Sequence, residues 1–128
     1  MKVWRVAHES ATCAGFPSGP YVSRGLPYEI QESLFKMTVA HSWVDSHPTP
    51  SLDPLLNGVD HAERCGFGSR EALYQWFDGY TSLLHECGFR EYVYEVPDAD
   101  VRVGQVGQAV FSSLSASEVS VTELAHAN

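Results

Sequence analysis

Two short helical segments that stand directly before a strand constrain the fold of this chain more than any other feature. Ser69 is a good N-cap for a helix over residues 69–77. TSLLHECGF (81–89) predicts a second helix, with Gly88 as its left-handed C′ residue. FREYVYEV (89–96) is the clearest strand, because β-branched and aromatic residues dominate it. A helix pair in front of this strand does not fit a simple βαβαβ alternation.

The remaining segments add one longer helix and further strands. VWRVAH (3–8) alternates between two faces, as a strand does. YEIQESLFKMTVAHSW (28–43) has apolar residues at helical spacing and acids in its first turns, so it predicts a helix. DADVRVG (98–104) predicts a short or bulged edge strand. GQVGQAVFS (104–112) predicts another strand, whose glycines indicate a bulge or a close ligand approach.

Together these elements predict an α+β fold. We expect one compact domain with a small mixed or antiparallel sheet, packed helices and a long loop that contains proline and histidine. The chain has 128 residues, enough for a single domain, which we place at residues 1–112. Residues 113–128 contain many small polar side chains and no Lys or Arg. We expect them to form a loosely ordered tail in which Ser117 caps one helical turn at most.

The segment from residue 41 to residue 68 shows no clear helical or strand period. It opens with HSWVDSHPTPSLDP (41–54), and only Asp60–Cys65 is compatible with one helical turn. Proline restricts the backbone at its own position and before it, so this loop can be rigid without regular structure. A metal loop, a ligand loop and a rigid connection all remain open. Compact domains seldom carry so long a loop unless it is functional.

The charge balance excludes several classes of function. Sixteen Asp and Glu stand against eight Lys and Arg, which gives a net charge of −8. General nucleic-acid binding is not expected, because neutralising phosphates requires Lys or Arg. No apolar run approaches the ~20 residues of a membrane span, and the first residues form no apolar signal segment. We expect a cytoplasmic protein without membrane association, whose acidity serves solubility or a basic partner.

Metal ligands and nucleophiles are only weakly indicated. His61 and Cys65 are four residues apart and would share a face of a helical turn, where both could reach one zinc ion. The wider spacing matches no zinc pattern, so we expect no metal, with a structural zinc as the minority alternative. The chain has no GxSxG, P-loop or CxxC motif, and its three cysteines do not suggest a disulfide framework.

Two polar residues on the predicted strands are stronger candidates for a site. Arg5 lies in an otherwise apolar strand, and a buried arginine needs a partner. That partner could be a structural carboxylate such as Glu95, or a phosphate or carboxylate of a ligand. Gln108 lies in GQAVF, where nearby glycines let another group approach. The alternative for Gln108 is a half-solvated strand face.

Six segments in a fixed order resemble small uncharacterised proteins found in phages and actinobacteria. They are VWRVAH, GPY, HPTP, CGFGSREALYQWF, GFREYVYEVPD and GQAVF. The resemblance runs from about residue 2 to residue 111, and it implies no particular activity.

The same residues also resemble, more weakly, the mono-ADP-ribosyltransferase superfamily, whose compact α+β domains pinch NAD between strands. This resemblance implies that Arg5 holds the phosphates or ribose of NAD and that Tyr21 or Tyr74 stacks on nicotinamide. Gln108 matches the late-strand position. The superfamily usually has Glu there, and Gln cannot carry the negative charge that supports a ribosyl cation.

On this resemblance the 41–54 loop lines the cleft. His47 would orient the ribose or the acceptor together with Gln108, and Trp43 would stack on the ligand or instead anchor the loop in the core. The implied activity is that of an NAD-dependent ADP-ribosyltransferase or NAD glycohydrolase. The alternative is a non-catalytic acidic interaction protein, such as a phage-encoded inhibitor of a bacterial defence or host factor, with a host protein as partner. A cleft in which Arg5, His47 and Gln108 converge would favour the first.

Overall fold

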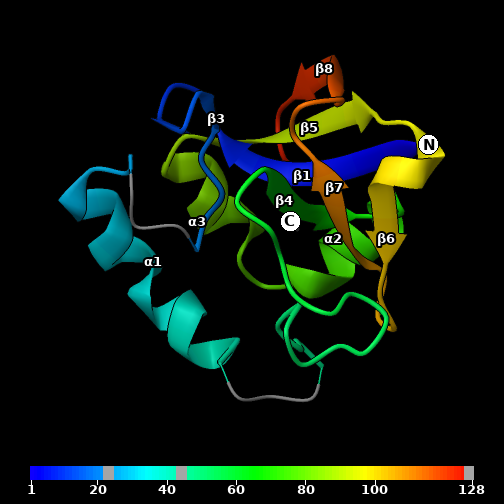
Figure 1. Cartoon of the computed structure of the whole chain (residues 1–128). Coiled ribbons are helices and arrows are strands. Elements are labelled where there is room, and N and C mark those ends of the chain that lie inside the picture. Colours follow the sequence, from blue (N-terminus) through cyan, green and yellow to red (C-terminus); the bar gives the residue numbers. More distant parts are fainter. Residues whose placement is uncertain (22–24, 43–45, 126–128) are drawn as a thin grey trace.

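The chain is organised around an antiparallel sheet with helices on one face (Figure 1). A computed structural model describes residues 1–21, 25–42 and 46–125. In this described part the main sheet has six strands in the order β6-β7-β4-β1-β5-β8. They are β1 (Lys2–His8), β4 (Glu63–Phe67), β5 (Phe89–Glu95), β6 (Val101–Val103), β7 (Gln108–Ser112) and β8 (Ser117–Thr122). Every neighbouring pair runs antiparallel, so the predicted α+β class is confirmed.

The smaller elements complete the fold. The helices are α1 (Tyr28–Ala40), α2 (Arg70–Trp76) and α3 (Thr81–Glu86), with one 3-10 turn, η1 (Asp98–Asp100). β2 (Thr12–Cys13) and β3 (Phe16–Pro17) form a separate two-stranded hairpin. The Ser69 side chain accepts a hydrogen bond from the backbone N–H of Ala72, so the predicted N-cap of α2 is confirmed. No helix in the described part is long and apolar enough to cross a membrane.

Both faces of the sheet are covered by apolar side chains. On one face, buried residues of the three helices pack against alternate residues of β1, β4 and β5. This helix-side core includes Val6, Leu34, Met37, Phe67, Leu73, Trp76, Phe77, Leu84 and Phe89. On the other face Tyr92, Tyr94 and Phe111 form an aromatic core that Phe16 of β3 covers. The sheet is therefore buried on both sides without a second layer of helices.

The sheet divides between β1 and β4. β1 pairs with β5 along its whole length, but its only register pair with β4 in the described part is Trp4 with Phe67. Beyond that pair the backbone N–H of His8 donates to the carbonyl of Ser18 at 2.8 Å. The chain that leaves β3 thus occupies the place beside β1 that β4 has left. This division creates the space in which the candidate site lies.

Two local predictions are wrong because pairing decides the structure. Asp60–Cys65 is compatible with a helical turn in the sequence, but residues 63–67 form β4 and pair with β7 over its whole length. Charged residues hide the apolar alternation by which a strand is recognised in a sequence. Pairing with neighbouring strands outweighs the local conformational preference of these residues. The helical turn expected at Ser117 is also absent, because residues 117–122 form β8 along β5. α1 ends at Ala40 rather than at residue 43.

The C-terminal segment contributes to the core through Leu124, which is 1% exposed and packs in the helix-side core. We expect Leu124→Ala to lower the free energy of unfolding by about 2–5 kcal/mol, as for other buried leucines. Urea denaturation followed by circular dichroism measures this. Leu114→Ala is the control, because Leu114 is 84% exposed and its loss should change stability by no more than about 0.5 kcal/mol. Equal midpoints for the two variants would contradict the docking of this segment.

Candidate ligand-binding site

A cavity of about 430 Å³ lies where β1 and β4 separate, between the sheet, α1 and the loop that precedes β4. We call it the Arg5 cavity. Four residues that the sequence singles out line it: Arg5, Tyr21, His47 and Gln108. They come from β1, the segment after β3, the proline-containing loop and β7. Residues far apart in the sequence therefore converge on one space.

Arg5 bridges the divided sheet. Its Nη1 donates to the carbonyl of Cys65 in β4, and its Nη2 donates to the carbonyl of Pro17 in β3 at 3.0 Å. Gly19 permits this position, because a Cβ there would lie 3.2 Å from Nη2. The internal partner is thus backbone and not Glu95, whose carboxylate accepts from the amino group of Met1.

The guanidinium of Arg5 is a buried cation without a carboxylate partner among the residues that the structure describes. Arg5 is 5% exposed, and its Nε has no hydrogen-bond partner among the described residues. Burial lowers the pKa of Arg5 to about 10, so the group stays charged at neutral pH. A buried charge of this kind is costly unless it is compensated, and an anionic ligand group would compensate it.

Gln108 supplies a hydrogen-bonding group at a second point of the cavity. It lies opposite Phe67 in the β4–β7 pair, and it is 6% exposed rather than half-solvated. Its Oε1 has no partner in the described part of the chain. An unsatisfied buried carbonyl costs free energy, so a ligand N–H or a water molecule is the natural partner.

Hydrogen bonds connect the side chains of the aromatic wall. The indole N–H of Trp76 donates to the Tyr21 oxygen at 2.9 Å, and the Tyr21 hydroxyl is also hydrogen-bonded to Nδ1 of His41. The His41 and His47 rings stack with centroids 3.9 Å apart and planes at 13°. Nε2 of His47 lies 2.7 Å from the carbonyl of Trp76, to which only an N–H can donate. The wall therefore holds the proline-containing loop against the C-terminal end of α2.

The surroundings of His41 favour its neutral form. Burial, reinforced by the neighbouring His47, lowers the pKa of His41 to about 4. His41 is therefore uncharged at neutral pH, whereas Arg5 is cationic.

Some of the sequence-predicted residues lie elsewhere. Tyr74 does not line the Arg5 cavity: its hydroxyl donates to Glu91 and accepts from the backbone N–H of Ala125 at 3.0 Å, while the Arg70 guanidinium lies over its ring. Its role is to connect α2, β5 and the C-terminal segment. Trp43 falls outside the described residues.

The histidine and cysteine considered for zinc are not arranged on a helix. Cys65 belongs to β4 and lines the cavity, whereas His61 is exposed before the strand begins. Within residues 1–21, 25–42 and 46–125, no group of three or more His, Cys, Asp and Glu side chains is placed to hold a metal ion.

The sequence did not point to three further lining residues, namely Glu63, Arg64 and Trp76. Glu63 and Arg64 belong to the unpredicted strand β4, so no local pattern could place them. Arg102 donates to both carboxylate oxygens of Glu63, at 2.6 and 3.1 Å, and these hydrogen bonds hold the pKa of Glu63 below its usual range. Trp76 reads as a core residue of a helix, and only its indole N–H indicates a second role.

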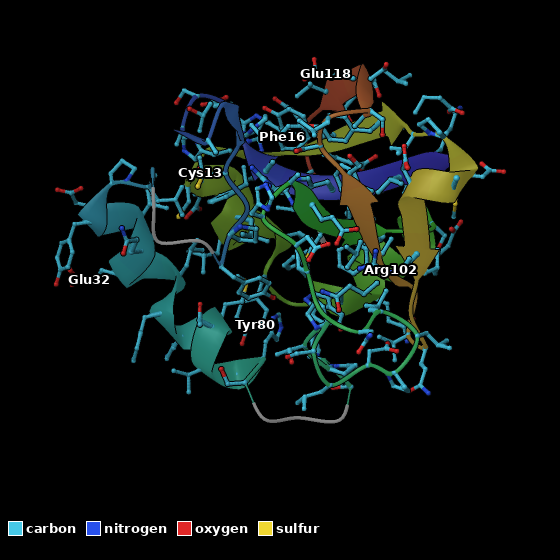
Figure 2. All side chains as sticks on the ribbon, in the orientation of Figure 1. Cys13, Phe16, Glu32, Tyr80, Arg102 and Glu118 are labelled. Carbon is cyan, nitrogen blue, oxygen red and sulfur yellow. The ribbon has the colours of Figure 1, made fainter. Side chains whose placement is uncertain are left out.

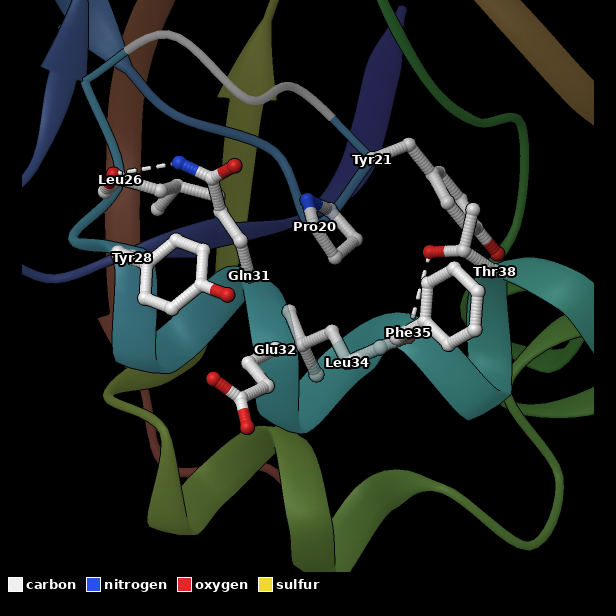
Figure 3. Close-up of a pocket in the computed structure, with 9 residues that line it drawn as sticks. All are labelled: Pro20, Tyr21, Leu26, Tyr28, Gln31, Glu32, Leu34, Phe35 and Thr38. Atoms are coloured by element: carbon white, nitrogen blue, oxygen red, sulfur yellow. Dashed lines mark hydrogen bonds between the residues drawn. The ribbon is translucent and has the colours of Figure 1, made fainter.

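A second cavity, of about 460 Å³, lies along the outer side of α1 (Figure 3). We call it the α1 groove. Tyr28, Glu32 and Phe35 project from α1 into it, with Pro20 and Tyr21 across from them. Tyr21 and Thr38 line both cavities. The α1 groove contains no buried charged side chain among its lining residues, so it lacks the polar anchor of the Arg5 cavity.

Comparison with known proteins gives one result. A family model described as Bacteriophage T4 Y00F protein matches residues 1–125. No curated protein and no solved structure matches the chain. The resemblance to a phage protein family is confirmed, and no match to an ADP-ribosyltransferase supports the second resemblance.

The neutral state of His41 predicts a pH-dependent contribution to stability. The pKa of His41 is lower in the folded state than the ordinary value of 6.5. Its neutral form therefore stabilises the fold above about pH 6.5, and this contribution is lost as the pH falls toward 4. Asn is neutral at every pH and keeps an acceptor, so His41→Asn lacks this loss of stability. The difference between the urea midpoints of wild type and His41→Asn should therefore shrink from pH 7 to pH 4.5.

His61→Asn is the matched control for this measurement, since His61 is exposed. Its difference from wild type should stay constant over the same pH range. A constant difference for His41→Asn as well would contradict the neutral, half-buried imidazole in the cavity wall.

Proposed function

We propose that this chain, which belongs to the bacteriophage T4 Y00F family, binds NAD or a related nucleotide in the Arg5 cavity. The observation that carries the proposal is the buried guanidinium of Arg5, which has no carboxylate partner among the described residues and lines a cavity with aromatic walls. A phosphate would supply the opposite charge, and the guanidinium fork suits it. The aromatic rings offer a stacking surface for a base or for nicotinamide.

The size and lining of the cavity support a small-molecule ligand. About 430 Å³ falls within the range of roughly 300–1,000 Å³ that is typical of ligand pockets. Such pockets combine apolar walls with a few fixed polar groups. Here the unpartnered Nε of Arg5 is a donor and the unpartnered Oε1 of Gln108 is an acceptor. A nucleotide carries both an anionic group and a ring with donors and acceptors.

Binding is better supported than group transfer. Loss of nicotinamide from NAD passes through an oxocarbenium-like state, which a carboxylate would stabilise. Glu63 is the carboxylate among the described lining residues, and both its oxygens accept hydrogen bonds from Arg102. Gln108 and His41 are uncharged at neutral pH. We therefore propose nucleotide binding as the primary function, with NAD hydrolysis or ADP-ribosyl transfer as an activity to assay by nicotinamide release.

A substitution of Gln108 tests the proposed binding of NAD without changing the hydrogen bonds of Arg5. We expect wild-type protein to give saturable heat with NAD in isothermal titration calorimetry and Gln108→Leu to bind about tenfold more weakly, because a ligand N–H loses its buried acceptor. Gln105→Leu is the matched control: Gln105 is exposed near the start of the same strand, so its affinity should equal that of wild type. Absence of heat from folded wild-type protein at millimolar NAD, ADP-ribose and AMP would overturn the proposal.

A second function, that of an acidic interaction protein, is favoured by the outer face of α1. Tyr28, Phe35 and Val39 are 73%, 66% and 55% exposed, and their spacing places them along one side of the helix. Exposed apolar residues that gather in this way often mark a protein contact. We propose a host protein as the partner, and the net charge of −8 favours a basic one.

Phe35→Ser tests this second function. Immobilised wild-type protein should retain a specific protein from an extract of host bacteria, and Phe35→Ser should lose most of it because the centre of the apolar face is removed. Leu114→Ser removes an even more exposed apolar side chain far from α1 in the sequence and should retain the partner. Retention by Phe35→Ser equal to wild type would exclude the outer face of α1 as the contact.

A further inference from the structure

We propose that Arg5 and Arg64 together form a phosphate subsite at the sheet end of the Arg5 cavity. This inference rests on the proposed nucleotide function and specifies which part of the ligand lies where. Arg64 is not singled out by the sequence, because it belongs to the unpredicted strand β4. Both side chains line the same cavity.

The other arginines that the structure describes are all paired, which sets Arg5 and Arg64 apart. Ion pairs join Arg70 to Glu91, Arg90 to Glu9 and Arg102 to Glu63. Neither Arg5 nor Arg64 has a carboxylate partner in the described part of the chain; both donate to backbone carbonyls. Acids outnumber Lys and Arg by two to one in the whole sequence, sixteen against eight. Two arginines that share a cavity without an ion pair therefore mark a place where the opposite charge comes from outside.

Both guanidinium groups contact the same ring. The guanidinium carbon of Arg5 and that of Arg64 each lie 5.6 Å from the centroid of the Phe16 ring (Figure 2 labels Phe16). Cation–π contacts compensate part of each charge. The two like charges still repel each other, since burial lowers the pKa of Arg5 and the charge of Arg64 contributes to this shift. An anion in contact with both would relieve the repulsion and the burial of Arg5 at once.

The two guanidinium groups are held in place yet keep unused donors. Nη1 of Arg64 donates to the carbonyls of His61 and Glu63, both at 2.9 Å, whereas Nη2 makes one long contact of 3.5 Å with the carbonyl of Cys13. Nε of Arg5 has no partner in the part of the chain that the structure describes. The carbonyls fix the side chains before a ligand arrives, which lowers the entropy cost of binding. The remaining N–H groups match the several oxygens of a phosphate.

The carboxylate that lines the cavity does not compensate the charge of Arg5 or Arg64. Glu63 lines the cavity, but Arg102 occupies both its oxygens. The opposite wall, formed by Tyr21, His41, His47 and Trp76, is aromatic and carries no anion. A phosphorylated nucleoside would therefore bind with its phosphate toward Phe16 and its ring toward the histidine pair.

Calorimetry with AMP and adenosine tests the subsite, because the two ligands differ only in the phosphate. We expect wild-type protein to bind AMP at least tenfold more tightly than adenosine. Arg64→Gln should reduce this preference to threefold or less, mainly by weakening AMP binding. Arg90→Gln is the control: it removes one positive charge from a side chain that lies outside the cavity lining and pairs with Glu9, so the preference should persist.

The outcomes separate the subsite from the proposed function. Equal affinities for AMP and adenosine in wild type would overturn the phosphate subsite while ligand binding in the cavity stands. No binding of AMP, adenosine or NAD would overturn both. Equal loss of preference in Arg64→Gln and Arg90→Gln would reduce the effect to overall charge and also overturn the subsite. If Arg64→Gln does not fold, the salt dependence in wild type decides: AMP affinity must fall with added salt much more than adenosine affinity.

Discussion

The bridge that Arg5 makes across the divided sheet is the contact on which the rest of the site depends. β1 and β4 share one register pair and then separate, and the guanidinium joins β4 to β3 where a backbone ladder would otherwise run. A side chain can span this gap only if it is long and has several donors, and Arg meets both requirements. Because the bridge keeps the two strands apart, it holds open the cavity that it lines.

The bridge also explains why the cavity is polarised. Bonds to carbonyls satisfy the N–H groups of a guanidinium, but they leave its charge without an opposite charge. Phe16 covers Arg5 and Arg64 from the aromatic core on the far side of the sheet, so both charges are shielded from solvent on that side. At the other end, His41 is hydrogen-bonded to Tyr21, and burial lowers its pKa to about 4, so that its ring is neutral at pH 7. One cavity thus has a cationic end and a neutral aromatic end.

The sequence is sufficient for the parts of this structure that local patterns determine. Alternation and caps place β1, β5 and the helices, and the rule that a buried arginine needs a partner identifies Arg5 from its position in an apolar strand. Pairing between distant strands determines the rest. β4 carries Glu63 and Arg64 in a segment without apolar alternation, and only β7 makes it a strand. Tyr74 and Tyr21 are equivalent candidates in the sequence, because both are aromatic. Only the orientation of α2 in the fold places the Tyr74 hydroxyl against Glu91 and not in the cavity.

The position of the charges explains how an acidic protein that disfavours nucleic acids could still bind a mononucleotide, as proposed above. A net charge of −8 argues against nucleic acids, because a polyanion meets the whole surface and its phosphates need many cations. A mononucleotide meets only the cavity, where Arg5 and Arg64 lie without acids of their own. The field at such a site is set by the nearest charges, since ionic screening reduces exposed charges more than about 10 Å away. An acidic protein can therefore select a small phosphate ligand and still repel the polymers that contain it.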